Sequence, residues 1–192
     1  MTIAELHLPK RSEEQCASTI GLPLFGCFER MFPELHKEEV QTCANTYRRI
    51  FAENLQTLKP QLFPGVIETL AKLSEQGFAL TIASSRSHAS LAELTQDMGI
   101  ARSISYLIGA DDVENAKPHP EPVLNTLKAM QTEAGQTLVV GDMAVDILMG
   151  ANAGAKTCGV TWGNGTKEEL QEAGADYIID KMDDVLSIVN EL

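Results

Sequence analysis

The sequence lacks any apolar run long enough to cross a bilayer, and its first residues lack the pattern of a secretory signal. A membrane-spanning helix needs about 20 consecutive apolar residues, whereas polar residues interrupt every apolar stretch of this chain much sooner. A signal peptide has a basic segment followed by an apolar one, and the first residues show no such order. We therefore expect a cytoplasmic protein with no membrane partner.

The sequence is also poor in basic residues. Lys and Arg number 15 against 27 Asp and Glu, which gives a formal net charge of -12. Nucleic acids and acidic membrane surfaces attract proteins through basic patches that displace counterions. The composition argues against both as partners, and it leaves room for a small anionic substrate where cationic side chains gather locally.

Paired cysteines and metal-type histidine spacings are missing as well. The cysteines stand far apart with no Cys-x-x-Cys pair, and the 4 histidines show no ligand spacing. Because zinc sites and disulfide frameworks depend on such spacings, we expect reduced structural thiols instead. The cysteines are Cys16, Cys27, Cys43 and Cys158.

What the sequence does contain is a change of pattern near residue 60. Residues 1–60 show only helical periodicity, with a helix start at Ser12, a turn at residues 20–24 and a long helical stretch within residues 33–58. Residues 61–192 alternate apolar, strand-like runs with helical segments; the runs lie at 78–83, 105–109, 137–140, 156–162 and 177–180. This alternation predicts a doubly wound parallel α/β sheet, preceded by a small helical domain.

Two acidic residues follow the most apolar of these strands. Residues 137–140 run into Gly141-Asp142, and Asp146 comes four residues later, before a helix of small residues over 147–155. Ligands of open α/β sheets bind at the carboxyl ends of the strands, and two carboxylates there suit a hard cation. The alternative is that Asp142 and Asp146 only cap the following helix.

A serine and a lysine occupy equivalent places after other strands. Ser84 ends the run at 78–83, where its hydroxyl and the next helix N-terminus could bind a phosphate oxygen, although a serine before a helix is also an ordinary cap. Lys117 lies in the loop Lys117-Pro118-His119-Pro120, whose prolines restrict the backbone. A lysine held there could offset the charge of phosphate and carboxylates, although most lysines are solvated surface groups.

Taken together, these residues resemble the haloacid dehalogenase-like hydrolase superfamily. Ser84, the Lys117 loop and Gly141-Asp142-x-x-x-Asp146 match the second, third and fourth motifs of that superfamily in order. Phe63-Pro64-Gly65-Val66 and the turn at 20–24 resemble its phosphoglycolate-phosphatase-like branch, which has a helical cap. The resemblance covers essentially the whole chain, and it implies residues 1–60 as a partial cap and residues 61–192 as the α/β core.

The resemblance implies a Mg2+-dependent phosphatase of small phosphorylated metabolites, as a monomer or homodimer. Ser84 would hold the phosphate, and Lys117 would stabilise both the nucleophile and the phosphate. Asp142 would bind Mg2+ directly or through water, and Asp146 would support the metal shell. Phosphoglycolate, a sugar phosphate, a nucleoside monophosphate and pyrophosphate all remain open as substrates, and so does phosphomutase activity.

The chain departs from the family at its first motif. The family opens with a strand that ends in Asp-x-Asp-Gly-[Thr/Val], whose first Asp is the nucleophile, and no such stretch occurs in these 192 residues. In the family that strand lies between the strands ending at Ser84 and Asp142. Losing its apolar side chains and ladder hydrogen bonds forfeits on the order of 10 kcal/mol, comparable to the stability of a typical domain. We therefore expect an N-terminally truncated form, marginally stable and inactive as written.

An alternative interpretation is a non-catalytic binding or regulatory protein derived from such a hydrolase. In that case a partner strand, or rearranged sheet pairing, would close the gap left by the absent strand. A helical interaction module joined to an unrelated α/β domain explains none of the motifs.

Overall fold

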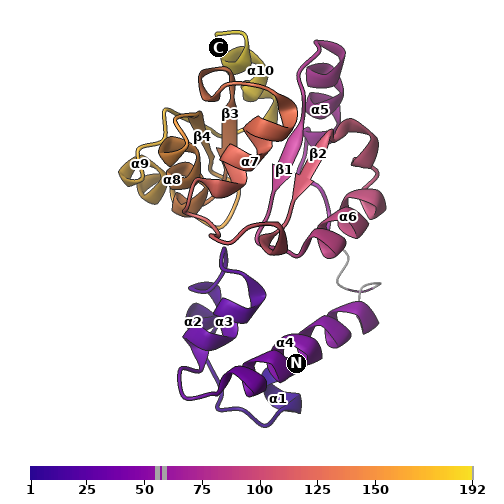
Figure 1. The fold of residues 1–192 in the computed structure, drawn as a ribbon, viewed down its shortest axis with the longest axis vertical. Coiled ribbons are helices and arrows are strands. Elements are labelled where there is room, and N and C mark those ends of the chain that lie inside the picture. Colours follow the sequence, from indigo (N-terminus) through magenta and orange to yellow (C-terminus); the bar gives the residue numbers. More distant parts are fainter. Residues whose placement is uncertain (55–56, 58–59, 192) are drawn as a thin grey trace. The chain divides into compact units, whose positions relative to one another are not determined.

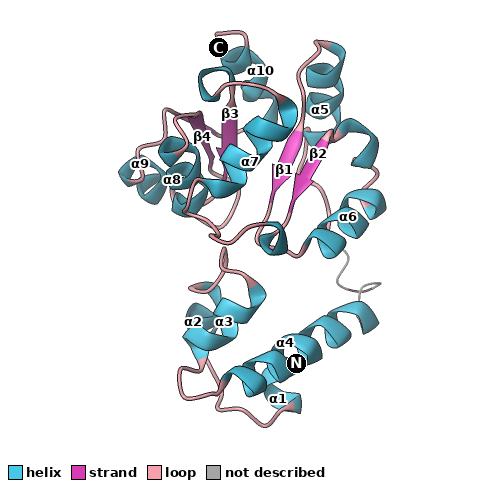
Figure 2. Cartoon of the chain, viewed as in Figure 1, coloured by secondary structure: helices cyan, strands magenta, loops and turns pink. Residues whose placement is uncertain are grey.

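The computed structural model describes residues 1–54, 57 and 60–191. The chain divides into two compact units, Met1–Gln61 and Leu62–Leu192, while the sequence places the boundary between residues 60 and 61. Most elements of both units are labelled in Figure 1, and Figure 2 separates helices from strands. None of the helices in the described ranges is long and apolar enough to cross a membrane.

The first unit is helical, as the periodicity of its sequence indicates. It contains α1 (Thr2–Glu5), α2 (Glu13–Ala17), α3 (Leu24–Met31) and α4 (Lys37–Glu53). The Ser12 hydroxyl accepts a hydrogen bond from the backbone N–H of Gln15 and so caps α2. The buried side chains of its core are Phe28, Phe32, Val40, Cys43 and Ala44.

Two details of the first unit differ from the sequence interpretation. The sequence pattern does not predict α3 as a separate helix. The structure begins this helix at Leu24, where the predicted turn over residues 20–24 ends. The long helical stretch predicted within residues 33–58 is α4, which begins at Lys37. Its predicted end includes residues 55, 56 and 58, which lie outside the described residues.

The second unit alternates helices and strands. In chain order it contains α5 (Val66–Glu75), β1 (Thr81–Ala83), α6 (His88–Asp97), β2 (Tyr106–Ile108), α7 (Glu121–Met130), β3 (Leu138–Gly141), α8 (Ala144–Asn152), β4 (Lys156–Val160), α9 (Lys167–Glu172), β5 (Tyr177–Ile179) and α10 (Val185–Val189). Short 3-10 turns cover Ala101–Ser103, Ala110–Asp112, Ala134–Gln136 and Met182–Asp184. The predicted α/β class is confirmed.

The strands form two separate parallel sheets. β1 pairs with β2, and β3 pairs with β4, which in turn pairs with β5. Figure 2 shows β1 and β3 as the inner strands of the two sheets, with β2 and β4 on their outer sides. Among the described residues no strand ladder joins β1 to β3, so the strand order is interrupted between the strands that end at Ser84 and Asp142.

Apolar clusters hold the two sheets together on both faces. On one face, Ala83 of β1 and Val139 of β3 pack against a cluster centred on Val123 and Leu127 of α7. On the other face, Leu80 and Leu138 pack against a cluster built mainly from α5, β4, β5 and α10. Each cluster therefore receives apolar side chains from both sheets.

The strand β1 is shorter than the predicted run at 78–83. Gly77 adopts a left-handed conformation with φ 87°, and the Phe78 N–H donates to the carbonyl of Leu73. This hydrogen bond, a common way for a helix to end, commits residues 77 and 78 to the end of α5. The helix α8, in contrast, starts earlier than the predicted helix over residues 147–155. It begins at Ala144 and so includes Asp146 in its first turn.

Candidate functional site

The loop that carries Lys117 is held by hydrogen bonds at both ends. The Glu121 carboxylate accepts from the backbone N–H groups of Glu114 and Asn115, at 2.8 and 2.9 Å. These donors hold the pKa of Glu121 below its ordinary value. On the other side, Asn152 Nδ2 donates to the carbonyl of Pro118 at 3.2 Å. The sequence analysis did not identify Glu121 as the residue that fixes this loop.

Lys117 forms a nearly buried ion pair with Asp146. Its Nζ lies 2.7 Å from Asp146 Oδ1, and the two side chains are only 13% and 12% exposed. The second oxygen of Asp146 accepts the backbone N–H of Met143 at 3.2 Å, which also caps α8. The helix-cap alternative therefore describes part of what Asp146 does, and the contact with Lys117 describes the rest.

A close backbone approach keeps Asp146 in place. A Cβ added to Gly141 would lie 2.2 Å from the Cβ of Asp146, so only glycine fits at the end of β3. Asp146 thus packs directly on the backbone that leads into Asp142.

Ser84 lies beside Lys117 at the carboxyl end of β1. The Ser84 N–H donates to the Ile108 carbonyl at 3.0 Å, which extends the pairing with β2. Its hydroxyl oxygen accepts the Arg86 N–H at 3.1 Å, and its own proton makes no hydrogen bond within the described residues. Ser84 and Lys117 line the same small depression together with Gly109 and Ala110. The structure therefore brings the predicted phosphate-binding pair together.

The floor of this depression is fixed by a second carboxylate. Asp112 accepts the Gly109 N–H at 2.7 Å and contacts the His88 ring at 2.6 Å. Burial alone would raise the pKa of Asp112, but these two hydrogen bonds outweigh it and hold the pKa below its usual value. The turn after β2 is thereby tied to the start of α6.

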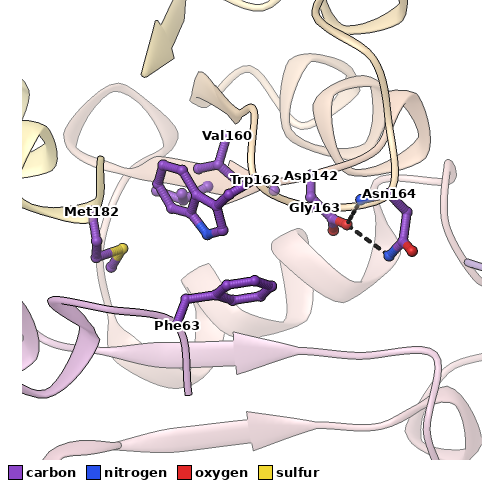
Figure 3. A pocket seen from close by; sticks show the side chains of 9 residues that line it. Phe63, Asp142, Val160, Trp162, Gly163, Asn164 and Met182 are labelled. Carbon is purple, nitrogen blue, oxygen red and sulfur yellow. Dashed lines mark hydrogen bonds between the residues drawn. The ribbon is translucent and has the colours of Figure 1, made fainter. Parts of the chain in front are cut away.

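Asp142 faces a different cavity. Its Oδ2 accepts from the backbone N–H and the side-chain amide of Asn164, at 2.8 and 3.0 Å (Figure 3). A Cβ on Gly163 would lie 2.1 Å from the Asp142 Cβ, so the loop after β4 closes tightly over this carboxylate. Sequence reasoning missed Asn164, although Gly163-Asn164-Gly165 at the end of a strand was an available signal.

The cavity beside Asp142 has a volume of about 500 Å³. Apolar side chains dominate its lining: the Phe63 and Trp162 rings face each other at 6.5 Å between centroids, and Val140, Val160 and Met182 complete it (Figure 3). Phe63 is 51% and Val140 is 39% exposed. Asp142 therefore lines this cavity and not the Ser84 depression, and the Gly141–Asp146 and Asp146–Lys117 contacts connect the two.

The carboxylates offer limited capacity for a cation. Within residues 1–54, 57 and 60–191, no group of three His, Cys, Asp or Glu side chains gathers as a metal site. Both oxygens of Asp146 are engaged, whereas none of the contacts made by the described residues occupies Asp142 Oδ1. Since Mg2+ keeps several waters and often binds through one or two carboxylates, Asp142 fits as a single ligand, held in place by Asn164, and Asp146 fits as a nearby carboxylate that pairs with Lys117.

The arrangement is suited to binding a phosphate group. Ser84 and Lys117 present one hydroxyl and one ammonium group to the same depression, whereas Asp142 lines the neighbouring cavity. Within residues 1–54, 57 and 60–191, no Asp side chain lines the depression that holds Ser84 and Lys117. The roles of Ser84, Lys117, Asp142 and Asp146 remain predictions.

Comparison with known proteins supports a single family. Residues 1–160 match the haloacid dehalogenase-like hydrolase family. "Probable phosphatase IndB" of Dickeya dadantii is 34% identical over 192 residues, which cover 99% of this chain and 84% of that protein. "Pyrophosphatase PpaX" of Halalkalibacterium halodurans is 33% identical over 187 residues, which cover 96% of this chain and 84% of that protein.

A solved structure gives the same result. The crystal structure of a "predicted phosphoglycolate phosphatase" from Haemophilus somnus superposes with a TM-score of 0.88 at 26% identity, and the match covers 97% of this chain and 86% of that one. Family match, sequence identity and fold agree with the motifs at Ser84, Lys117 and Asp142. The chain belongs to the haloacid dehalogenase-like hydrolase family.

Proposed function

We propose that this chain supplies the phosphate-binding and Mg2+-binding residues of a phosphatase that acts on small phosphate monoesters. The observation that carries the proposal is the position of Lys117, which lines the Ser84 depression while its ammonium group pairs with Asp146. The names of the relatives IndB and PpaX, a probable phosphatase and a pyrophosphatase, both describe hydrolysis that releases phosphate.

The residues would divide the work as follows. The Ser84 hydroxyl would donate to a phosphate oxygen, and Lys117 would offset the negative charge of the phosphate. Asp142 would hold Mg2+, which neutralises charge on the transferred phosphoryl group when it is bound. Asp146 would act as a positioning residue, because it fixes Lys117 from the first turn of α8.

Turnover requires a nucleophile that these 192 residues do not contain. The sequence has no Asp-x-Asp-Gly motif, and removal of a nucleophile can lower kcat by roughly a millionfold. We therefore expect this chain to bind phosphate without hydrolysing phosphate esters. A version joined to a strand that ends in Asp-x-Asp-Gly should hydrolyse p-nitrophenyl phosphate in the presence of Mg2+.

The test is calorimetric titration of the chain with inorganic phosphate, with and without MgCl2. Lys117→Ala should abolish phosphate binding, and Asp142→Asn should remove the dependence on Mg2+. Lys156→Ala is the matched control, because Lys156 is an exposed lysine of the same unit that pairs with Asp176. Equal phosphate affinity in all three variants would rule out the proposed site.

A second candidate is a non-catalytic regulatory protein. The missing Asp-x-Asp-Gly motif and the engaged Asp146 carboxylate favour it. In that case the strand-extended version would bind phosphate and still fail to release it from an ester.

A further inference from the structure

We propose that His88 is a positioning residue for the binding of a tetrahedral oxyanion, phosphate or sulfate, in the Ser84 depression. His88 acts through Asp112 on the turn that forms one wall of the depression, and the anion binds most tightly when the His88 ring carries a proton. This role rests on the proposed function, because the anion site is the same. Within the described residues the His88 ring does not line the depression, so it acts through other groups.

The turn after β2 forms this wall. Its residues Gly109 and Ala110 line the depression together with Ser84. The Ala110 N–H donates to the Arg86 carbonyl at 2.7 Å, and the Gly109 N–H donates to Asp112 Oδ2 at 2.7 Å. The position of the wall therefore depends on these two hydrogen bonds.

His88 holds the same turn at two further points. Its backbone N–H donates to Asp111 Oδ1 at 2.6 Å, and its ring Nδ1 lies 2.6 Å from Asp112 Oδ2. The Gly109 N–H donates to that same carboxylate oxygen. The His88 ring and the wall residue Gly109 therefore share one oxygen atom, and a ring that fixes this oxygen also fixes the wall.

Close packing makes the wall sensitive to the ring contact. A Cβ added to Gly109 would lie 2.3 Å from the backbone nitrogen of His88, so the start of α6 packs directly on the turn. The turn cannot move closer to α6, and loss of the ring contact allows movement only away from it. Such movement displaces the wall and weakens the anion site.

The charges around the pair give the pH dependence a definite sign. The His88 and Asp112 side chains are 48% and 35% exposed, so the ring exchanges protons with solvent. A protonated ring makes a charge-assisted hydrogen bond to Asp112, which is stronger than a bond from a neutral ring. It also offsets one of the two carboxylates, Asp111 and Asp112, that repel an anion nearby. Both effects weaken anion binding when the ring loses its proton.

Histidine is the residue type that ordinarily changes charge between about pH 5 and 8. The other titratable or charged side chains come from segments that flank α6, pack against it or share the depression. They are Arg86, Arg102, Tyr106, Asp111, Asp112 and Lys117. Side chains of these types ordinarily titrate outside this range, so a change of anion affinity within it reports on a histidine.

The test is calorimetric titration of the protein with sulfate at about pH 5.5 and about pH 8, at constant ionic strength. Sulfate keeps its charge over this range, whereas phosphate changes its own. The wild-type protein should bind sulfate about fivefold more tightly at the lower pH. Lys117→Ala should not bind sulfate at either pH, which would locate the bound anion in the depression.

Two variants of His88 separate charge from hydrogen bonding. His88→Asn keeps an N–H donor near the position of Nδ1 and has no charge. Its sulfate affinity should equal that of the wild-type protein at the higher pH and should not change with pH. His88→Leu has no donor and should bind sulfate about fivefold more weakly than His88→Asn. A role limited to stability would leave the affinity of folded His88→Leu unchanged.

His119→Asn is the matched control. His119 is the other histidine of the second unit, and its side chain is 49% exposed, against 48% for His88. Its ring Nδ1 accepts the Glu121 N–H at 3.2 Å, and the described contacts do not join it to the turn after β2. The ratio of sulfate affinities at the two pH values should remain about fivefold in this variant.

Thermodynamic linkage provides an independent measurement. If protonation tightens sulfate binding about fivefold, bound sulfate must favour protonation of the His88 ring by the same factor. The midpoint of the His88 ring in an NMR titration should therefore move to higher pH by about 0.7 at saturating sulfate, the logarithm of that factor. The midpoint of His119 should not move.

Three results would overturn the role of His88 alone. They are equal sulfate affinity of the wild-type protein at both pH values, equal affinity of His88→Leu and His88→Asn, and a pH dependence that disappears in His119→Asn but persists in His88→Asn. In each case sulfate still binds, and the proposed function stands. Absence of sulfate binding by the wild-type protein at both pH values, or binding that survives in Lys117→Ala, would overturn the proposed function and the role of His88 with it.

Discussion

Replacing Lys117 with methionine tests how strongly the Lys117–Asp146 pair holds the second unit together. The two side chains are 13% and 12% exposed, so the remaining carboxylate would stay nearly buried. The only other hydrogen bond of this carboxylate within the described residues comes from the Met143 N–H. Removing one partner of a buried ion pair leaves an uncompensated charge, and we expect a loss of about 3 kcal/mol.

The measurement is urea unfolding followed by Trp162 fluorescence, which reports on the second unit alone. With a urea dependence of roughly 1–3 kcal/mol/M, the unfolding midpoint should fall by about 1 M or more. The double variant Lys117→Met/Asp146→Leu should recover most of this loss, because an apolar pair removes both charges together.

Lys156→Met provides the matched control. The Lys156–Asp176 pair has a similar length of 2.9 Å, but its side chains are 51% and 33% exposed. Asp176 also keeps its hydrogen bonds from the N–H and hydroxyl of Thr157. The midpoint of this variant should hardly change, since exposed pairs contribute little. Equal shifts for Lys117→Met and Lys156→Met would refute the reasoning.

Three further predictions follow from described contacts. Gly141→Ala should destabilise the second unit and weaken phosphate binding, because the added Cβ would lie 2.2 Å from Asp146; urea unfolding and calorimetry would check this. The stability of the second unit should fall as pH drops below about 4, because the pKa of Asp112 is lowered in the folded state; its contribution is complete above the unfolded-state pKa and is lost as pH falls through the folded one. Asp112→Asn should therefore flatten this part of a stability-versus-pH curve. Burial raises the pKa of the Cys158 thiol to about 11, so iodoacetamide at neutral pH should label the half-buried Cys16 well before Cys158, as mass spectrometry of the native protein would show.

Local patterns in the sequence were sufficient to predict most elements of the second unit. The β-branched run before Gly141 is β3, and the segments that begin near Val66, His88 and Lys167 are helices α5, α6 and α9. These elements are each specified by apolar periodicity and by a residue that starts or ends them. The α/β class followed from their alternation.

Contacts between distant residues were not accessible to the same reasoning. Lys117 and Asp146 are 29 positions apart, and no periodicity relates a loop to the first turn of a later helix. The Asn164 contact with Asp142 depends in the same way on how the loop after β4 folds back. The helix α3 was missed for a local reason, because Gly26 in its middle and Pro23 before it favour a turn.

The sheet topology has a consequence for folding kinetics. Every strand pair joins strands that are neighbours in the chain and are linked by intervening helical segments, as in Thr81↔Tyr106 and Leu138↔Lys156. Closing such short loops costs little chain entropy, and low contact order accompanies fast folding. Each sheet should thus be able to nucleate on its own within one continuous stretch of polypeptide. The docking of the two sheets across α7 would then be the slow, late step, with the Lys117–Asp146 contact among the last to form.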